Sequence, residues 1–255
     1  MSIRFAADIG GTFTDVVLDK NGLVHSKKLL TTYEDPANAV IAGLDQLMSE
    51  AVLEAKDIEL VLHGTTLATN ALIERSGAKT ALLTTEGHRD VLEMAFENRF
   101  EQYDVDIDRR PPLIDRSLRV GVRQRHASDG EEIIPLDREQ VVSSVRLLSE
   151  QGVTSYAVGY LHSYTNPSHE LSTLEIIKDV VPEASVSLSS RVCPEIREYE
   201  RLSTTAANAY IKPLMEEYLE SLELQLRSRG LSCPLLLMTS GGGLTTLDTA
   251  KDYPI

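Results

Sequence analysis

The feature that most restricts the fold of this chain is a pair of adjacent glycines between two apolar segments near the N-terminus. Residues 7–15 read Ala-Asp-Ile-Gly-Gly-Thr-Phe-Thr-Asp, and the apolar residues Ile3 and Phe5 precede them. This pattern predicts two strands joined by a tight glycine turn. Adjacent glycines let the backbone come close to a ligand and leave N–H groups pointing outward.

The polar residues around this turn suit a phosphate group with a divalent metal ion. Thr12 and Thr14 lie two residues apart, so a strand would place both hydroxyls on one face, and Asp8 and Asp15 bracket the turn with carboxylates. Magnesium prefers a few carboxylates, waters and phosphate oxygens. A plain hairpin with exposed threonines is the alternative. The stretch matches neither a P-loop nor a dinucleotide fingerprint.

The next residues predict a meander of three antiparallel strands followed by a helix. Asn21-Gly22 is a strong hairpin signal, and residues 23–30 form the expected third strand. Asp35 and Pro36 have the residue types of a helix N-cap and first helical position. Apolar residues then recur at helical spacing up to Val52, which predicts one buried helix face.

A second polar segment follows the apolar strand predicted at residues 60–63. It reads Gly-Thr-Thr from Gly64 to Thr66 and leads into a helix expected to end near Gly77. A strand that feeds a helix N-terminus in this way can hold an anion or a polar substrate. The alternative is a threonine cap beside a histidine, His63, at the edge of the core.

These motifs carry a resemblance to a known family. Residues 8–15 resemble the first phosphate motif of the actin, sugar-kinase and heat-shock-chaperone ATPase superfamily, in the form used by the hydantoinase A and 5-oxoprolinase family. Residues 63–71 and 194–201 are similar to further blocks of that family. The resemblance implies an α/β, ribonuclease-H-like actin-type ATPase fold with a mixed sheet flanked by helices and an incomplete second lobe. It also implies an N-terminal domain at residues 1–190 and the start of a second domain at residues 191–255.

The resemblance further implies an ATP-dependent hydrolase that opens cyclic amides or imides of the hydantoin or 5-oxoproline type through a phosphorylated substrate, with ATP and Mg²⁺ as cofactors. The implied catalytic residues are Asp8, Asp15 and His63, with Asp8 also positioning the metal. The implied phosphate-binding residues are Gly10, Gly11, Thr12 and Thr14. The residues of second rank are Thr65, Thr66, Asn70, Glu195, Arg197, Glu198, Ser240, Gly241 and Gly242. Gly241 stands where the family commonly has asparagine.

Two alternatives to the hydrolase remain open. Subunits of ATP-dependent ketone carboxylases, of the acetone or acetophenone type, resemble the same family. A non-catalytic assembly lobe that needs a partner chain is the other alternative. Because stabilising a transferring phosphoryl group needs donors from more than one direction, one phosphate loop should bind nucleotide weakly. We therefore expect this chain to be inactive alone, to need a C-terminal half or a hydantoinase B-type subunit, and to form an oligomer.

Composition restricts the partners and the compartment. The 255 residues carry a net charge of −14, which argues against a nucleic-acid surface. The resemblance implies a small-molecule substrate. No apolar run approaches membrane-spanning length and no signal segment opens the chain, so we expect a cytoplasmic protein without a membrane partner. Cys193 and Cys233 lack metal-type spacing. His162 and His169 flank Pro167 and are expected to be structural, and Pro213 is expected to break or restart the helix in which it lies.

Overall fold

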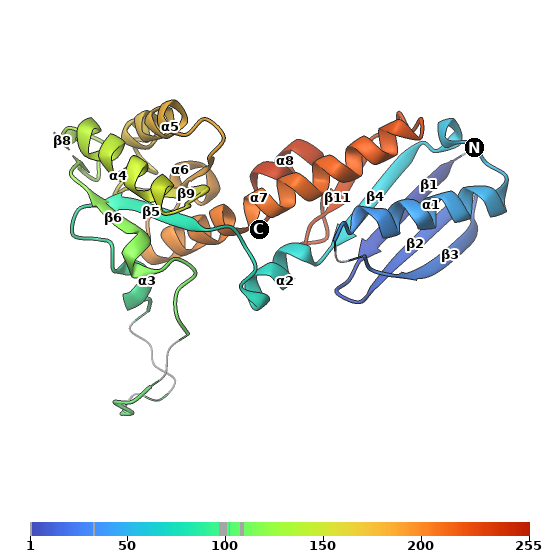
Figure 1. Cartoon of the computed structure of the whole chain (residues 1–255), viewed down its shortest axis with the longest axis horizontal. Helices are drawn as coiled ribbons and strands as arrows, with labels where there is room; N and C mark the ends of the chain where they lie inside the picture. Colours follow the sequence, from blue (N-terminus) through green and yellow to red (C-terminus); the bar gives the residue numbers. More distant parts are fainter. Residues whose placement is uncertain (1, 33, 97–100, 102, 108–109) are drawn as a thin grey trace. The chain divides into compact units, whose positions relative to one another are not determined.

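The structure is a computed structural model that describes residues 2–32, 34–96, 101, 103–107 and 110–255 (Figure 1). The chain forms two compact units. Unit 1 consists of Met1–Ser76 and Leu214–Pro254, and unit 2 consists of Gly77–Pro213. The chain therefore leaves unit 1 once and returns to it.

Unit 1 is built on a six-stranded mixed sheet with the strand order β12-β11-β4-β1-β2-β3. Its elements are β1 (Ile3–Ile9), β2 (Phe13–Lys20), β3 (Leu23–Leu30), α1 (Ala37–Ala51), the 3-10 helix η1 (Ala55–Asp57), β4 (Leu60–Thr65), α2 (Leu67–Glu74), β11 (Leu235–Met238), β12 (Leu244–Thr246) and α8 (Leu247–Asp252). Strands β1, β4 and β11 are parallel to one another, whereas β1–β2, β2–β3 and β11–β12 are antiparallel pairs.

The predicted meander and the helix after it are confirmed. Asn21 and Gly22 both have positive φ, 55° and 88°, as the two-residue turn between β2 and β3 requires. Helix α1 lies across this part of the sheet (Figure 1). It begins one residue later than predicted, after Pro36, and the carboxylate of Asp35 accepts a hydrogen bond from the Ala37 backbone N–H at 3.1 Å.

The sheet of unit 1 has one covered face and one open face. Residues of β1 and β2 alternate between buried and more exposed positions. The buried set packs with α1, α8 and the last part of the long helix α7 (Glu198–Ser228) into one apolar core. Asp8 and Asp15, which are paired in the β1–β2 register, lie on the other face. The core therefore fixes which side chains near the glycine turn reach solvent.

Unit 2 is built on a four-stranded parallel sheet with the order β10-β9-β5-β6. Its elements are β5 (Thr80–Thr85), α3 (Val91–Met94), the 3-10 helix η2 (Arg116–Leu118), β6 (Arg119–Val122), β7 (Arg125–His126), β8 (Glu132–Ile134), α4 (Arg138–Glu150), β9 (Ser155–Gly159), α5 (Ser168–Val180), β10 (Ser185–Leu188) and α6 (Ser189–Val192). Every residue of β5 and β9 is buried, as expected for a parallel sheet that is covered on both faces.

The prediction that Pro213 breaks or restarts its helix is wrong, because α7 continues through it. Proline has no backbone N–H, so the carbonyl of Ala209 loses its usual helical donor. The hydroxyl of Ser155 supplies a replacement, donating to Ala209 O at 2.6 Å. A contact distant in sequence thus compensates for the proline. Within the part of the chain that the structure describes, no helix has the length and apolar character needed to cross a membrane.

Candidate functional site

The carboxyl ends of the parallel strands in unit 1 meet at one edge of the sheet. The register places Ile9 beside Thr65 and His63 beside Leu237. The segments that follow these strands therefore leave the sheet side by side: the glycine turn after β1, the start of α2 after β4, and residues 239–243 after β11. This edge is the usual place for a ligand in an open α/β sheet.

The glycine turn is held from one side and open on the other. The backbone N–H of Gly10 donates to Phe13 O at 2.9 Å and closes the turn. Thr31 donates its backbone N–H to Thr12 O and its hydroxyl to Gly10 O, each at 3.0 Å. Gly11 and Thr12 are exposed, and no acceptor among the described residues takes their backbone N–H groups. The turn thus presents two unsatisfied donors to solvent, which suits an anion.

Thr14 differs from the expectation that it binds phosphate. It is fully buried, and its hydroxyl lies 3.0 Å from that of Thr31. The reason is register: Thr14 is paired with Ile9, whose side chain also faces the core. Thr14 therefore supports the turn through Thr31, and the exposed threonine of the turn is Thr12.

The two carboxylates beside the turn have different surroundings. Asp15 forms an ion pair with Lys28, with Lys28 Nζ 2.6 Å from Asp15 Oδ2. Asp8 is exposed, and none of the described residues donates a hydrogen bond to its carboxylate or forms an ion pair with it. Gly64 lies next to Asp8, where a Cβ would stand 3.0 Å from Asp8 Oδ1. Of the two, Asp8 is the carboxylate that is accessible to a hydrated Mg²⁺.

The start of α2 is attached directly to the glycine turn. Thr66 donates its backbone N–H and its hydroxyl to Ile9 O, at 3.0 and 3.2 Å. The Thr65 hydroxyl accepts from the backbone N–H of Leu67 at 3.1 Å. The Asn70 amide nitrogen lies 3.4 Å from the Thr66 hydroxyl, and a Cβ on Gly11 would be 3.3 Å from it. The two sequence motifs therefore form one site, in which Gly11 leaves room for Asn70.

His63 lies beneath this site, and its burial does not fit the expected contact with substrate. It is 1% exposed, its Nδ1 is 3.2 Å from Ala7 O, and its Nε2 is 2.6 Å from the Tyr218 hydroxyl. A carbonyl only accepts, so Nδ1 carries the proton and Nε2 accepts from Tyr218. Burial lowers the pKa of His63 to about 4 and raises the pKa of Tyr218 well above its usual value, which keeps both groups neutral. His63 therefore lies in the core, where its hydrogen bonds join β4 to β1 and to α7.

Comparison with known proteins agrees with these two motifs. Residues 4–181 match the family model for the hydantoinase/oxoprolinase N-terminal region, and residues 201–255 match the hydantoinase/oxoprolinase model. The chain belongs to the hydantoinase/oxoprolinase family. It is 36% identical over 249 residues to the caprolactamase subunit alpha of Pseudomonas jessenii, covering 94% of this chain and 36% of that protein. It is 34% identical over 253 residues to the acetophenone carboxylase gamma subunit of Aromatoleum aromaticum, covering 92% and 35%.

Solved structures show the same fold. The crystal structure of the ATP-dependent caprolactamase from Pseudomonas jessenii matches with a TM-score of 0.86 at 35% identity, covering 96% of this chain and 36% of that one. A nucleotide-free acetone carboxylase structure matches with a TM-score of 0.86 at 24% identity, covering 98% and 38%. The α/β actin-like ATPase fold expected from the sequence is thereby confirmed. The chain spans a little over a third of the length of these relatives.

A cavity of about 440 Å³ adjoins the glycine turn of this hydantoinase/oxoprolinase family chain. It is acidic and extends between α2 and the last part of α7. Its lining consists of Gly10, Gly11, Thr31, Glu34, Asp35, Pro36, Leu67, Asn70, Ala71, Glu74, Ser76, Leu214, Glu217, Tyr218 and Ser221. Thr31 and Tyr218 could not be predicted as site residues, because nothing in their local sequence indicates that they contact the turn and His63.

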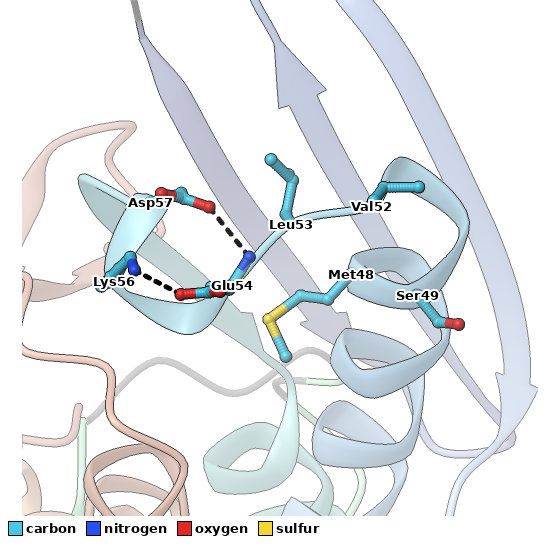
Figure 2. A pocket seen from close by; sticks show the side chains of 7 residues that line it. All are labelled: Met48, Ser49, Val52, Leu53, Glu54, Lys56 and Asp57. Atoms are coloured by element: carbon cyan, nitrogen blue, oxygen red, sulfur yellow. Dashed lines mark hydrogen bonds and ion pairs between the residues drawn. The ribbon is translucent and has the colours of Figure 1, made fainter.

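A second hollow in unit 1, of about 500 Å³, lies at the end of α1 and contains none of the expected site residues (Figure 2). Its charged side chains are already paired. Lys56 contacts Glu54 at 2.5 Å, and Asp57 accepts from the Glu54 backbone N–H at 2.9 Å. The Asp57 contact belongs to the capping box of η1, and the hollow contains no expected site residue, so we place the candidate site at the glycine turn.

The remaining second-rank residues fall into two groups. Ser240, Gly241 and Gly242 lie in the exposed turn between β11 and β12, at the same sheet edge as the glycine turn. Glu195, Arg197 and Glu198 belong to unit 2, at and just before the start of α7. Glu195 and Arg197 are exposed, and the Glu195 carbonyl accepts from Arg201 Nη1 at 2.6 Å. The strand pairing of unit 1 therefore places Ser240, Gly241 and Gly242 at the same sheet edge as the glycine turn. Glu195, Arg197 and Glu198 are not at this edge, and their roles remain predictions.

Proposed function

We propose that this chain provides the phosphate-binding part of an ATP-dependent hydrolase that opens a cyclic amide or imide, such as a lactam, hydantoin or 5-oxoproline. One observation carries the proposal: the free backbone N–H groups of Gly11 and Thr12 lie in the turn that directly follows β1, and β1 carries the uncovered Asp8 carboxylate near its end. Donors for phosphate beside a carboxylate for hydrated Mg²⁺ are the combination that a metal–nucleotide complex requires.

The chemistry explains why such a hydrolase would use ATP. An unstrained amide is a poor electrophile, and phosphorylation of its oxygen makes the carbonyl carbon more electrophilic. Water adds to that carbon, the ring C–N bond breaks as the nitrogen takes up a proton, and hydrolysis of the resulting acyl phosphate releases phosphate and leaves the carboxylate. In this proposal Gly10, Gly11 and Thr12 hold phosphate oxygens, and Asp8 orients waters around the metal. On the core side of the sheet, Thr14 and Thr31 hold the turn in place, and His63 holds strand β4. The residues at the start of α2, Thr65, Thr66 and Asn70, lie against the turn and form the side nearer the cyclic substrate.

The rest of the proposed nucleotide site comes from groups beyond this sheet edge. A bound triphosphate needs donors from more than one direction, and the described turn supplies one. We propose that a second lobe or a partner subunit supplies the others, within an oligomer; the relatives named caprolactamase subunit alpha and acetophenone carboxylase gamma subunit support this. A boundary between the two family regions near residue 190, which falls inside compact unit 2, is part of the same proposal and is supported by family matches that end at 181 and resume at 201.

A subunit of an ATP-dependent ketone carboxylase is the second candidate. Identity of 34% to the acetophenone carboxylase gamma subunit favours it. The same turn would then hold ATP while an enol oxygen and bicarbonate are phosphorylated. A non-catalytic assembly lobe is the third candidate, and the free donors of the turn argue against it.

A phosphate-release screen separates the three candidates. The full-length protein, purified with its associated subunits, is incubated with Mg²⁺ and ATP and with caprolactam, hydantoin, 5-oxoproline, or acetophenone plus bicarbonate. Release that depends on a cyclic amide or imide, and that Asp8→Asn lowers at least tenfold, supports the hydrolase. Release that depends on ketone and bicarbonate supports the carboxylase instead. Absence of release with every substrate, together with nucleotide affinity that Asp8→Asn leaves unchanged, supports the assembly lobe and overturns the proposal.

A further inference from the structure

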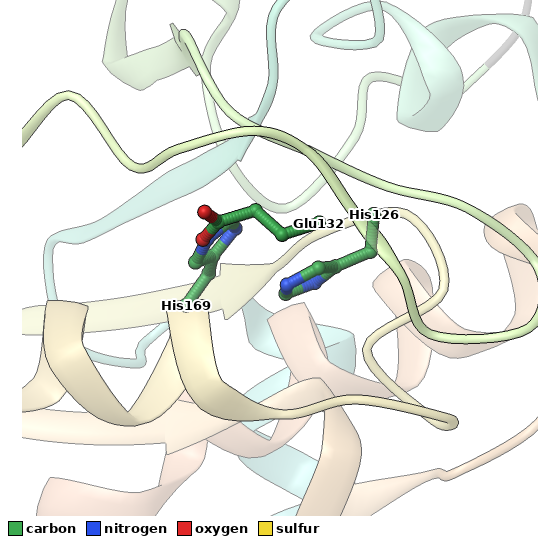
Figure 3. A group of neighbouring side chains, drawn as sticks. All are labelled: His126, Glu132 and His169. Atoms are coloured by element: carbon green, nitrogen blue, oxygen red, sulfur yellow. The ribbon is translucent and has the colours of Figure 1, made fainter.

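Unit 2 contains a compact group of metal-ligating side chains that the proposed reaction does not use. His126 lies in β7, Glu132 in β8 and His169 in the first turn of α5 (Figure 3). One ligand atom from each side chain lies within 4.8 Å of the other two. His169 Nε2 and Glu132 Oε2 are 2.7 Å apart, and the two imidazole rings stack with centroids 3.9 Å apart. Two short strands and the first turn of α5 thus bring two histidines and a carboxylate together.

His126 has a buried polar atom that the protein itself does not satisfy. The residue is 1% exposed, and among the described residues its Nδ1 has no hydrogen-bond partner. Its Nε2 is 3.5 Å from the Ser168 hydroxyl, so Nδ1 is the ring nitrogen left available. Leaving a buried polar atom unpaired is unfavourable, so such an atom in a native fold indicates a missing partner. In a group that also contains Glu132 and His169, a cation is the partner of suitable chemistry.

A neighbouring amide holds His169 in the orientation of a metal ligand. Gln124 donates through Nε2 to the Thr85 hydroxyl at 2.5 Å, which turns its amide oxygen toward His169 Nδ1 at 3.0 Å. Nδ1 therefore carries a proton, and Nε2 faces the Glu132 carboxylate. An outer hydrogen bond that fixes the tautomer of a histidine in this way is a regular feature of metal sites.

We propose that His126, His169 and Glu132 bind a divalent transition-metal ion of the zinc class, with water in the remaining position. Two imidazoles and one carboxylate favour such an ion over Mg²⁺ or Ca²⁺, which prefer oxygen ligands. Zinc–nitrogen bonds of about 2.0–2.1 Å in a tetrahedron place ligand atoms about 3.3 Å apart. Glu132 has a side chain that is 52% exposed, so it is free to close the remaining gap.

The bound ion would join the β7–β8 hairpin to helix α5. Strand β7 has two residues and β8 has three, and an isolated two-stranded hairpin is at best marginally stable. The Asn166 side chain already holds the hairpin turn by donating to Gly130 O at 2.9 Å. His126 and Glu132 are paired next to this turn, so a metal bridge would add a second link between the hairpin and α5. Metal binding should therefore stabilise unit 2 and leave the glycine turn of unit 1 unchanged.

The test is a Zn²⁺ titration of the full chain without an affinity tag, in competition with a chromophoric chelator. We expect one ion per chain, with a dissociation constant below about 10 μM, and a rise in Tm of about 5–10 °C at a hundredfold excess over that constant. Glu132→Gln removes one ligand at an exposed position and should weaken binding at least tenfold. His126→Ala should do the same, with circular dichroism as the check on its fold. Co²⁺ substitution should give the visible spectrum of a tetrahedral nitrogen–oxygen site.

Two controls make the result specific. His88→Ala removes a partly exposed histidine of unit 2 outside the group, and Asp8→Asn removes the proposed magnesium carboxylate; neither should change zinc affinity. The proposal is overturned if the chain shows no saturable binding of one ion. It is also overturned if Glu132→Gln binds zinc as tightly as the wild type, or if His88→Ala weakens binding as much as Glu132→Gln does.

Discussion

Burial of His63 makes a quantitative prediction about how stability depends on pH. The ring donates from Nδ1 to Ala7 O and accepts from the Tyr218 hydroxyl at Nε2, so the folded protein holds it neutral. Burial lowers its pKa from 6.5 to about 4. In the unfolded chain the same side chain takes up a proton near its ordinary pKa. Folding and protonation of His63 therefore oppose each other.

The sign and size follow from the two pKa values. Between pH 6.5 and 4 the unfolded state binds one more proton at His63 than the folded state, so the free energy of unfolding falls as the pH falls. Each pH unit is worth about 1.4 kcal/mol, so the full window lowers the stability by about 3 kcal/mol. Above pH 6.5 the residue adds no pH dependence, and below pH 4 the loss is complete.

Urea denaturation followed by circular dichroism between pH 4 and 8 measures this effect. The comparison is between the wild type and His63→Gln, which cannot gain a proton but keeps an oxygen that can accept from Tyr218. The difference in unfolding free energy between the two proteins should change by about 3 kcal/mol across the window. His25→Gln, on strand β3, is the matched control and should follow the wild type. A wild-type minus His63→Gln difference that stays constant from pH 7 to pH 4 would refute the assignment of His63 as a buried neutral ring.

Two further predictions concern the glycine turn. Gly11→Ala should leave the unfolding free energy within about 1 kcal/mol of the wild type. It should weaken ATP binding about tenfold, because the new methyl would stand 3.3 Å from Asn70 Nδ2 in the exposed turn. Unchanged ATP affinity in calorimetry would count against phosphate binding at this turn. Thr31→Val should lower the unfolding free energy by about 1–3 kcal/mol in urea denaturation. The reason is that it leaves the buried Thr14 hydroxyl and Gly10 O without the Thr31 hydroxyl as their partner. A loss below about 0.5 kcal/mol would contradict these two hydrogen bonds.

The local parts of the fold could be predicted from the sequence because local chemistry determines them. The turn at Asn21 and Gly22 needs positive φ at both positions, and those residue types adopt it most readily. The Asp35 and Pro36 pair marked the start of α1 to within one residue. The pairing of β11 with β4 was not predicted, because it joins segments about 170 residues apart and depends on the whole of unit 1. The same holds for Ser155, whose hydroxyl lets α7 continue through Pro213.

The sequence predicted the residue types of the site better than their exposure. Gly11 and Thr12 are exposed in the turn and Asp8 is exposed near the end of β1, so their binding roles remain predictions. Thr14 and His63 carry suitable functional groups, but the strand register turns both toward the core, where hydrogen bonds engage them. Alternation along a strand shows which residues share a face, and only packing decides which face is covered.

The central claim is that Asp8 and the glycine turn bind ATP with Mg²⁺, and titration calorimetry of the assembled protein tests it most directly. The matched control for Asp8→Asn is Asp19→Asn. Asp19 lies on the same open face of the sheet as Asp8. It follows Asp15, the β2 residue paired with Asp8, by four residues, which is about 13 Å along the strand. We predict that Asp8→Asn weakens Mg²⁺–ATP binding at least tenfold, that Asp19→Asn does not, and that the difference disappears without Mg²⁺. Equal affinity of Asp8→Asn and the wild type in the presence of Mg²⁺ would contradict the claim.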